Sequence, residues 1–486
     1  MMRRSSVIAL AASLALAGCV AGPPPRIDTA PPDLPGDFAL AVDPSAQATL
    51  DALLPTSDPA FAILSHVALA EGPRLAEAVA RIDAARAAAD RAGANWLPSV
   101  GAEASVTGQR TNPNQFGAAL PPGIAFDTER VAYAANLTAS WDPDLFGRLR
   151  ARERAASARV DAAGAEAAAV RVALLSEIAA AVVDCRTLDQ REAALRSDLA
   201  AAQRLVELSL SRERAGIAPG FDRVRAESAA EASLTRIEAL ESERARLIGR
   251  LVTLTGQPAQ TVLDALDEPV PETTLPAPPA SLPSELLSRR PDVQAAAARL
   301  AASDADLYAT AAQRFPQFSL SAVLGLLSFD LGGLFDEDAV VGSAGAGLLA
   351  PILDFGRIEA EIDGAAADKR ASFQAYRNAV FTALGDAETG YGLVAAADRE
   401  LAAATREAAS AERAANLADT RFRAGLSNFL EVLEARRSAD TSGERAAAAR
   451  GRALRARILL WQALGGGDAG RAGAPGSGQP PPPISE

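Results

Sequence analysis

Residues 143–148, Pro-Asp-Leu-Phe-Gly-Arg, and residues 351–357, Pro-Ile-Leu-Asp-Phe-Gly-Arg, each open a run of 67 residues that contains no proline. The runs extend from Arg148 to Arg214 and from Arg357 to Arg423 and are dominated by Ala, Leu, Arg and Glu, the strong helix formers. At 1.5 Å per residue, a continuous helix of this length would be about 100 Å long. A globular core cannot hold two such helices, so the runs predict a coiled coil or a helical bundle.

Each run ends at the same signal, Arg-Ala-Gly, and a second helical stretch follows it. The step from Gly147 to Gly356 and the step from Gly216 to Gly425 are both 209 residues, so the chain contains one unit twice. Glycine stops a helix, and we therefore expect an antiparallel helical hairpin in each copy, with its tip at Gly216 or Gly425. The predicted helices are 148–215, 219–256, 356–424 and 428–464.

Before each long run the hydrophobic period changes from 3.6 residues to 2. Apolar residues alternate with small or polar ones, as in the series Phe318, Leu320, Ala322, Leu324 and Leu326. This alternation predicts strands at about 98–109, 130–141, 316–327 and 340–350. Their length is that of transmembrane β-strands, which alternate lipid-facing and lumen-facing positions. A hairpin of a soluble β-sandwich is the alternative interpretation.

Four strands per chain have a consequence for the assembly. The smallest membrane barrels have eight strands, and an open sheet edge is not tolerated in lipid. If these strands cross a membrane, several copies of the chain must therefore share one barrel. The residues alone do not determine how many copies take part.

The start of the chain has the pattern of a secretory signal. Arg3 and Arg4 form a basic region, residues 7–17 are apolar, and Leu16-Ala17-Gly18-Cys19 matches the lipoprotein-processing box. We expect cleavage before Cys19 and a covalent diacylglycerol and acyl chain on that residue, with no other cofactor. The alternative is an ordinary signal peptide with a chance cysteine. No stretch has the roughly 18 uncharged apolar residues of a transmembrane helix.

Composition argues against several classes of function. A net charge of −13 disfavours nucleic acid, whose binding needs clustered positive charge. Cys185 is the only cysteine after Cys19 and lies in a helical context, where we expect a small buried side chain. The single histidine, His66, cannot build a metal site or a catalytic triad alone. No nucleophile, base and orienting group fall together, so we do not expect an enzyme.

These patterns divide the chain into six segments. They are a signal peptide (1–18), a lipidated extended segment (19–70), the first repeat (71–256), a linker or equatorial segment (257–283), the second repeat (284–464) and a disordered tail (465–486).

The chain resembles the TolC-like outer membrane factors, in particular the lipoprotein branch of multidrug efflux channels (the NodT type). The resemblance rests on the Cys19 box, both Phe-Gly-Arg hairpins, Ser288-Arg289-Arg290-Pro291-Asp292-Val293, and the segment from Arg421 to Ala435. It covers about residues 70–464. In this class Val20, where inner-membrane retention would need Asp, favours the outer membrane.

The resemblance implies a mainly α fold with a transmembrane β part. A homotrimer would form a 12-stranded barrel continued by an α-helical tunnel across the periplasm. It would dock on a periplasmic adaptor (membrane fusion) protein and an inner-membrane pump of the RND type. Such a protein is a passive conduit that opens at its periplasmic tip.

Family members close that tip with acidic and apolar side chains near the start of the last helix. Carried over by position, these are Leu430, Glu431 and Glu434. Glu431 and Glu434 lie three residues apart, on one helix face, and an acidic ring attracts cations. Two departures from the family are Glu in place of the common Asp and Ser427 in place of a basic gate-locking residue. The alternative is that these glutamates are solvated, with Glu434 paired to Arg436 or Arg437.

The resemblance also implies that the hairpin tips at Gly216 and Gly425 contact the adaptor, although both glycines are equally explained as helix stops. Three other functions are alternatives to the efflux conduit. One is the outer membrane channel of a type I protein secretion system, and another is a structural lipoprotein spacer without a pore. The third, an enzyme with an unrecognised site, has no supporting residues. The transported substrate stays open.

Overall fold

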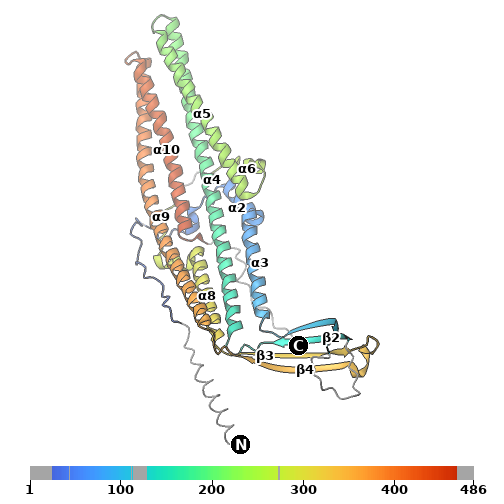
Figure 1. The fold of residues 1–486 in the computed structure, drawn as a ribbon. Coiled ribbons are helices and arrows are strands. Elements are labelled where there is room, and N and C mark those ends of the chain that lie inside the picture. The colour runs from blue at the N-terminus through green and yellow to red at the C-terminus, as the bar shows by residue number, and fades with distance from the viewer. Residues whose placement is uncertain (1–24, 43, 111, 113–128, 272–273, 468–486) are drawn as a thin grey trace, which may run out of the picture. The chain divides into compact units, whose positions relative to one another are not determined.

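The computed structural model describes residues 25–42, 44–110, 112, 129–271 and 274–467 (Figure 1). The signal peptide, Cys19, most of the residues between the first two predicted strands and the tail from 468 lie outside these residues. The described part is mainly helical and contains one sheet. Its elements, apart from short 3-10 turns, are α2 (Pro59–Glu71), α3 (Pro73–Ala94), β1 (Ser99–Arg110), β2 (Glu129–Trp141), α4 (Arg148–Arg214), α5 (Gly220–Thr255), α6 (Ala259–Leu266), α7 (Leu286–Arg289), α8 (Pro291–Ala311), β3 (Gln317–Ser328), β4 (Val340–Leu349), α9 (Arg357–Arg423) and α10 (Phe429–Ala463).

The four long helices and the four strands lie within one or two residues of the bounds expected from the sequence. One expectation was wrong. Residues 19–70 were expected to be extended, but they include most of α2. The linker or equatorial segment 257–283 includes the short helix α6. In α2 the Asp58 side chain accepts the Ala60 amide, Pro59 occupies the first turn, and Phe61 and Leu64 are buried. These start signals were present in the sequence.

The Phe-Gly-Arg motif starts each long helix through a carboxylate cap. In the first copy Asp144 accepts the amides of Leu149 at 2.8 Å and Arg150 at 2.9 Å. In the second copy Asp354 accepts the amide of Ile358 at 2.9 Å. These bonds satisfy amide donors that the first helical turn would otherwise leave free. The motif glycines adopt positive φ, +72° at Gly147 and +85° at Gly356, where a side chain would be strained.

The four strands form one antiparallel sheet in the order β1-β2-β3-β4. The central pair joins the two copies of the repeat, with Leu137 opposite Leu324. Large apolar side chains on the sheet are exposed, among them Val100, Val106, Leu137, Leu324 and Leu348. Within the described part of the chain β1 and β4 are edge strands, so each leaves a row of backbone groups without a strand partner there.

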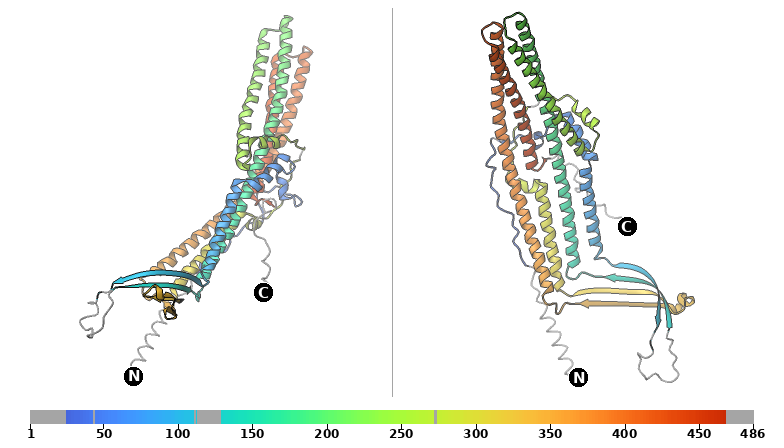
Figure 2. Two further views of the ribbon diagram at one scale, coloured as in Figure 1. Left: turned by 90° about the vertical axis from the view of Figure 1, so that its right-hand side faces the viewer. Right: turned by 45° about the horizontal axis from the view of Figure 1, so that its top comes forward.

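The chain forms two compact units, and each takes segments from both copies of the repeat. Of the residues that the structure describes, the first comprises those within 25–29, 84–160 and 298–374, and the second those within 30–83, 161–297 and 375–467. The first unit contains the sheet, and its strands are connected to the ends of the neighbouring helices (Figure 2). Its core is a cluster formed by Leu307, Ala311, Ile358, Ile362 and Ala366. The ring of Phe146 stacks on that of Phe315, with centroids 4.9 Å apart.

The second unit contains α5, α10 and the parts of α4 and α9 that begin at residues 161 and 375. The helices run as two antiparallel pairs, α4/α5 and α9/α10 (Figures 1 and 2). We call α4/α5 the first hairpin and α9/α10 the second hairpin. Trp461, Leu460 and Tyr391 are among the largest fully buried side chains of this unit. Among the described residues, none of the helices combines enough length with enough apolar character to span a lipid bilayer.

Arg290, the third residue of the segment Ser288 to Val293, fastens three helices of the second unit together. Its guanidinium donates to both oxygens of Asp292 at the start of α8 (3.0 and 2.7 Å) and to Asp386 on α9 (3.0 Å). A further bond at 3.0 Å goes to the carbonyl oxygen of Ala463, at the end of α10. This motif therefore has a structural role inside the second unit.

Candidate functional site

The tip of the second hairpin is a glycine turn followed by a capped helix. Gly425 has φ +77°; its amide donates to the carbonyl of Phe422 at 2.9 Å, and the Leu426 amide donates to that of Arg421 at 2.8 Å. This pair of bonds is the Schellman motif that ends helices at glycine. Asn428 then caps α10 by accepting the Glu431 amide at 2.9 Å. The Asn428 side-chain amide donates back to Glu431 Oε1 at 3.1 Å, so Glu431 is engaged at the helix start.

The three predicted gate residues, Leu430, Glu431 and Glu434, lie on the exposed side of α10. Leu430 is 45% exposed although it is apolar, whereas its neighbours Phe429 and Val432 are buried. The proposed pairing of Glu434 with Arg436 is not observed, because Arg436 donates instead to Glu412 (3.5 Å) and Asn416 (3.2 Å). Glu434 forms no ion pair with any residue that the structure describes. The Glu434 carboxylate is thus exposed to solvent, whereas Glu431, also exposed, accepts a hydrogen bond from Asn428.

The tip of the first hairpin repeats the glycine turn, but the start of α5 after Pro219 has no side-chain cap among the described residues. Gly216 has φ +69°, and the Ile217 amide donates to the carbonyl of Arg212 at 3.0 Å. Arg223 on α5 donates to Glu213 on α4 at 2.9 Å, which closes the hairpin. Ile217 is 68% exposed and its counterpart Leu426 is 70% exposed. Both tips therefore present an apolar side chain directly after the glycine.

An apolar cluster joins the two tips, and the sequence reasoning missed it. The cluster consists of Leu205, Ala226, Phe422, Phe429 and Val432, which come from all four helices of the two hairpins. We call these five residues the tip cluster. The guanidinium carbon of Arg212 lies 4.5 Å from the centre of the Phe422 ring, a cation–π contact between α4 and α9. The two phenylalanines that flank the Gly425 turn were the available signal for this cluster.

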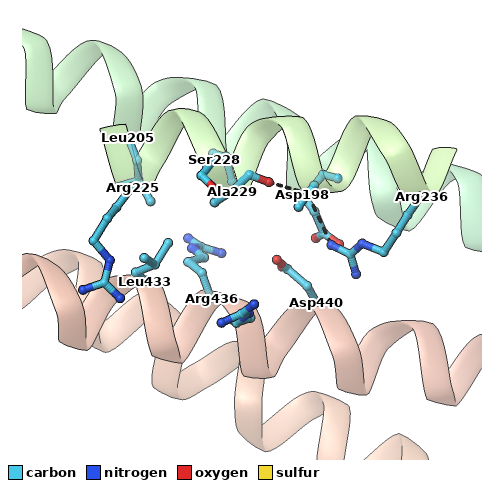
Figure 3. Close-up of a pocket in the computed structure, with 14 residues that line it drawn as sticks. Asp198, Leu205, Arg225, Ser228, Ala229, Arg236, Leu433, Arg436 and Asp440 are labelled. Atoms are coloured by element: carbon cyan, nitrogen blue, oxygen red, sulfur yellow. Dashed lines mark hydrogen bonds between the residues drawn. The ribbon is translucent and has the colours of Figure 1, made fainter. Parts of the chain in front are cut away.

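A polar cavity of about 230 Å³ lies between the two hairpins, adjoining the tip cluster at Leu205 (Figure 3). Its walls hold Asp198 from α4, Arg225 and Arg236 from α5, and Arg436 and Asp440 from α10. Figure 3 shows these side chains extending from both sides into the space between the helices. Asp198 and Asp440 are 242 positions apart, and no local pattern predicts that they meet.

The described residues contain no group of three or more His, Cys, Asp or Glu side chains arranged to hold a metal ion. Cys185 is buried and free, as the sequence analysis expected. Burial raises the pKa of its thiol to about 12, helped by the neighbouring carboxylates of Asp189 and Asp184. A thiol of this kind is a poor nucleophile at neutral pH, because the thiolate is the reactive form.

Comparison with known proteins shows which proteins have a similar sequence. Residues 64–257 and 282–466 match the family model described as "Outer membrane efflux protein". The chain is 31% identical over 401 residues to the pyoverdine export outer membrane protein OpmQ of Pseudomonas aeruginosa, covering 82% of this chain and 84% of that protein. It is 28% identical over 436 residues to nodulation protein T of Rhizobium leguminosarum bv. trifolii, covering 88% and 90%.

Solved structures agree with this match. The outer-membrane channel OprN superposes with a TM-score of 0.80 at 28% identity, covering 91% of this chain and all of that one. The outer membrane protein VceC of Vibrio cholerae superposes with a TM-score of 0.75 at 25% identity, covering 84% and 96%. The long hairpins and the four-stranded sheet are therefore features that this chain shares with channels of the outer membrane.

Proposed function

This chain belongs to the outer membrane efflux protein family, and from that premise we propose that three copies form one conduit with a 12-stranded barrel and a helical tunnel. The observation that supports a shared barrel is the four-stranded sheet with two free edges and exposed apolar side chains in the described residues, and the number three comes from the family resemblance. Such a sheet can lie in lipid only if a further strand forms hydrogen bonds with each of its two edge strands. Pairing β1 of one copy with β4 of the next would supply them.

The hairpin tips are the proposed periplasmic end of the conduit, where an adaptor protein and an inner-membrane pump of the RND type would dock. Exposed Ile217 and Leu426 beside Gly216 and Gly425 give the adaptor an apolar contact. Leu430 would narrow the pore, and Glu431 and Glu434, repeated by the threefold axis, would form an acidic ring that attracts cations. The protein catalyses no reaction in this proposal.

We further propose that Cys19 is lipidated and adds an acyl anchor in the outer membrane. Acyl chains contribute about 0.8 kcal/mol for each buried CH₂ group, so two or three chains anchor a protein stably. Metabolic labelling with a fatty acid tests this, with Cys19→Ser as the unlabelled control. We expect Cys19→Ser to lose the label and to keep the oligomer, because the strands already hold each copy in the membrane.

The decisive test is conductance of the purified protein in planar bilayers under a salt gradient. We expect cation selectivity in the wild type and a lower selectivity in the double variant Glu431→Gln, Glu434→Gln. Glutamine keeps the hydrogen bonds around Asn428 and removes only the charges. The matched control is Glu238→Gln, an exposed glutamate on α5 away from the tips.

Two outcomes would contradict the proposal. Silence of the wild type and also of the variants Glu431→Ala and Glu434→Ala would favour a structural spacer without a pore. Equal loss of selectivity in Glu238→Gln would mean that general surface charge, and not the tip, selects the ion.

The relatives are named for pyoverdine export and toluene efflux. We accordingly propose small molecules as the passengers of this conduit, in preference to a secreted protein.

A further inference from the structure

Two carboxyl groups from different hairpins meet in the cavity between the hairpins. Asp198 belongs to α4 of the first hairpin and Asp440 to α10 of the second, and both line the same cavity (Figure 3). Asp198 Oδ2 is buried and receives no hydrogen bond from any group that the structure describes. Burying a carboxylate oxygen away from water without a hydrogen-bond donor costs free energy. A proton on one of the two carboxyls removes that cost, because it turns one group into a donor to the other.

Two of the four arginines that line the cavity also contact other polar or acidic groups. Arg236 on α5 contacts Ser233 (3.3 Å) and Glu444 (3.6 Å). Arg436 on α10 is held by Glu412 of α9 and by Asn416, and Glu412 itself adds negative charge near the pair. The remaining charged groups that line the cavity are the guanidiniums of Arg225 on α5 and Arg437 on α10.

The balance of these surroundings favours the protonated form of one carboxyl. Burial and the neighbouring carboxyl of Asp440, which favours the protonated form as a hydrogen-bond partner and by charge repulsion, raise the pKa of Asp198 to about 8, while Arg236 acts in the opposite direction. Burial also raises the pKa of Asp440, against the effects of Arg236 and Arg436. Two carboxyls in contact titrate as a pair, so one proton belongs to both of them.

We propose that Asp198 and Asp440 share one proton at neutral pH, and that this proton fastens the first hairpin to the second as a pH-sensitive clasp. Loss of the proton leaves two negative charges facing each other across a partly dry cavity, and the helices that carry them repel. Asp440 is 12 residues past the cap residue Asn428, about 18 Å along α10 from the tip. Loosening at this level weakens the support of the tip cluster.

The direction of the pH effect follows from linkage. When the hairpins separate, both carboxyls return to water and their pKa values fall to the ordinary range. The separated form therefore binds fewer protons than the packed form between about pH 4 and pH 8. Separation becomes easier as the pH rises through this range, by up to about tenfold per pH unit, and the effect levels off above about pH 8. Below about pH 4 the stabilisation of the packed form by the bound proton is at its maximum.

Hydrogen exchange of the full-length protein in detergent, followed by mass spectrometry from pH 5 to pH 9, tests the proposal. Exchange times are scaled for the intrinsic pH dependence of the chemistry. We expect protection in the peptides around Asp198 and Asp440 to fall as the pH rises and then to level off near pH 8. In Asp198→Asn the amide donates to Asp440 at every pH, so we expect the profile to become flat.

The matched control is Asp419→Asn, which removes a carboxylate paired with Arg423 of its own helix and should keep the wild-type profile. Wild-type protection of the peptide covering α2 shows that a variant is folded; if Asp198→Asn fails this check, Asp440→Asn replaces it, with the same expected result. The carbonyl band of a protonated carboxylic acid in infrared difference spectra gives an independent titration of the wild type. A flat wild-type exchange profile, an unchanged profile in the Asn variant, or absence of that band near pH 7 would each overturn the proposal.

Discussion

Replacing Arg290 by methionine should loosen the junction of α8, α9 and α10, and the size of the effect can be worked out from its contacts. The Arg290 side chain is only 9% exposed, whereas those of its partners Asp292 and Asp386 are 44% and 50% exposed. Removing one partner of a fully buried ion pair costs about 3–5 kcal/mol. In the variant, water can solvate the two half-exposed carboxylates. The free energy lost with the ion pairs is therefore closer to the range of about 0–1 kcal/mol that holds for exposed pairs.

The carbonyl of Ala463 loses a donor in addition, which costs about 1–3 kcal/mol because the bond is buried. Methionine retains part of the packing of the arginine stem. We therefore expect Arg290→Met to cost about 2 kcal/mol, equivalent to about a 30-fold change in a local opening equilibrium. Amide hydrogen exchange of the peptide that begins α8 measures this opening directly.

Arg452→Met is the matched control, because Arg452 on α10 pairs with Glu400 while both side chains are about half exposed. We expect its exchange to change by less than about fivefold, in line with the small value of exposed pairs. Protection in Arg290→Met within threefold of the wild type would refute the reasoning. So would an equal loss in the two variants, because burial would then have no influence.

The Arg290–Asp292 pair at this junction also predicts how the stability of the protein changes at acidic pH. Burial acts to raise the pKa of Asp292, but the hydrogen bond and charge of Arg290 outweigh it, and the net pKa is lowered from its ordinary value of 3.8. The pair therefore contributes its full stability above about pH 4 and loses it as the pH falls through the lowered pKa. The difference between wild type and Arg290→Met should shrink in that acidic range and stay constant at neutral pH.

Three further changes can be tested in the same way. Asn428→Ala should cost about 1 kcal/mol at the start of α10, seen as faster exchange there, whereas Asn428→Asp should not; equal effects would mean that the cap is unimportant. Phe422→Ala removes a buried ring from the tip cluster and should cost about 3–5 kcal/mol, with faster proteolysis at both tips, while cleavage confined to the second tip would show that the cluster does not join the hairpins. Cys185 should resist iodoacetamide at pH 8 until the protein is denatured, and rapid alkylation of the folded protein would contradict its burial.

Much of the fold was accessible from the sequence because its strongest signals are long and repeated. The proline-free runs and the Arg-Ala-Gly stops predicted α4 and α9 to within a residue at each end. The period-2 alternation located all four strands of the sheet. These are local patterns, and the repetition of the unit made each one visible twice.

Features that depend on tertiary contacts were not accessible. The short helix α6 lies in a Pro-rich linker, and what stabilises it is burial of Val262 and Ala265. The compact units combine pieces of both repeats, since β2 of the first copy pairs with β3 of the second in one sheet. The pair Asp198 and Asp440 depends on a contact between two hairpins, which no helical period reports. The gate residues were found only through the resemblance, and their function stays a prediction.

The pairing of β2 with β3 sets an order of events in folding. Within the β1–β2 pair the nearest partners, Arg110 and Glu129, are 19 residues apart, but Trp141 and Leu320 of the β2–β3 pair are 179 apart. Closing the longer loop costs about 2 kcal/mol more in chain entropy, from (3/2)RT ln(179/19). Each β-hairpin can therefore form early and by itself, while the seam between them waits until the helices of the first repeat and α8 have been made. During that interval the inner edges of both hairpins are unprotected, so the nascent protein is most vulnerable to aggregation before the sheet is complete.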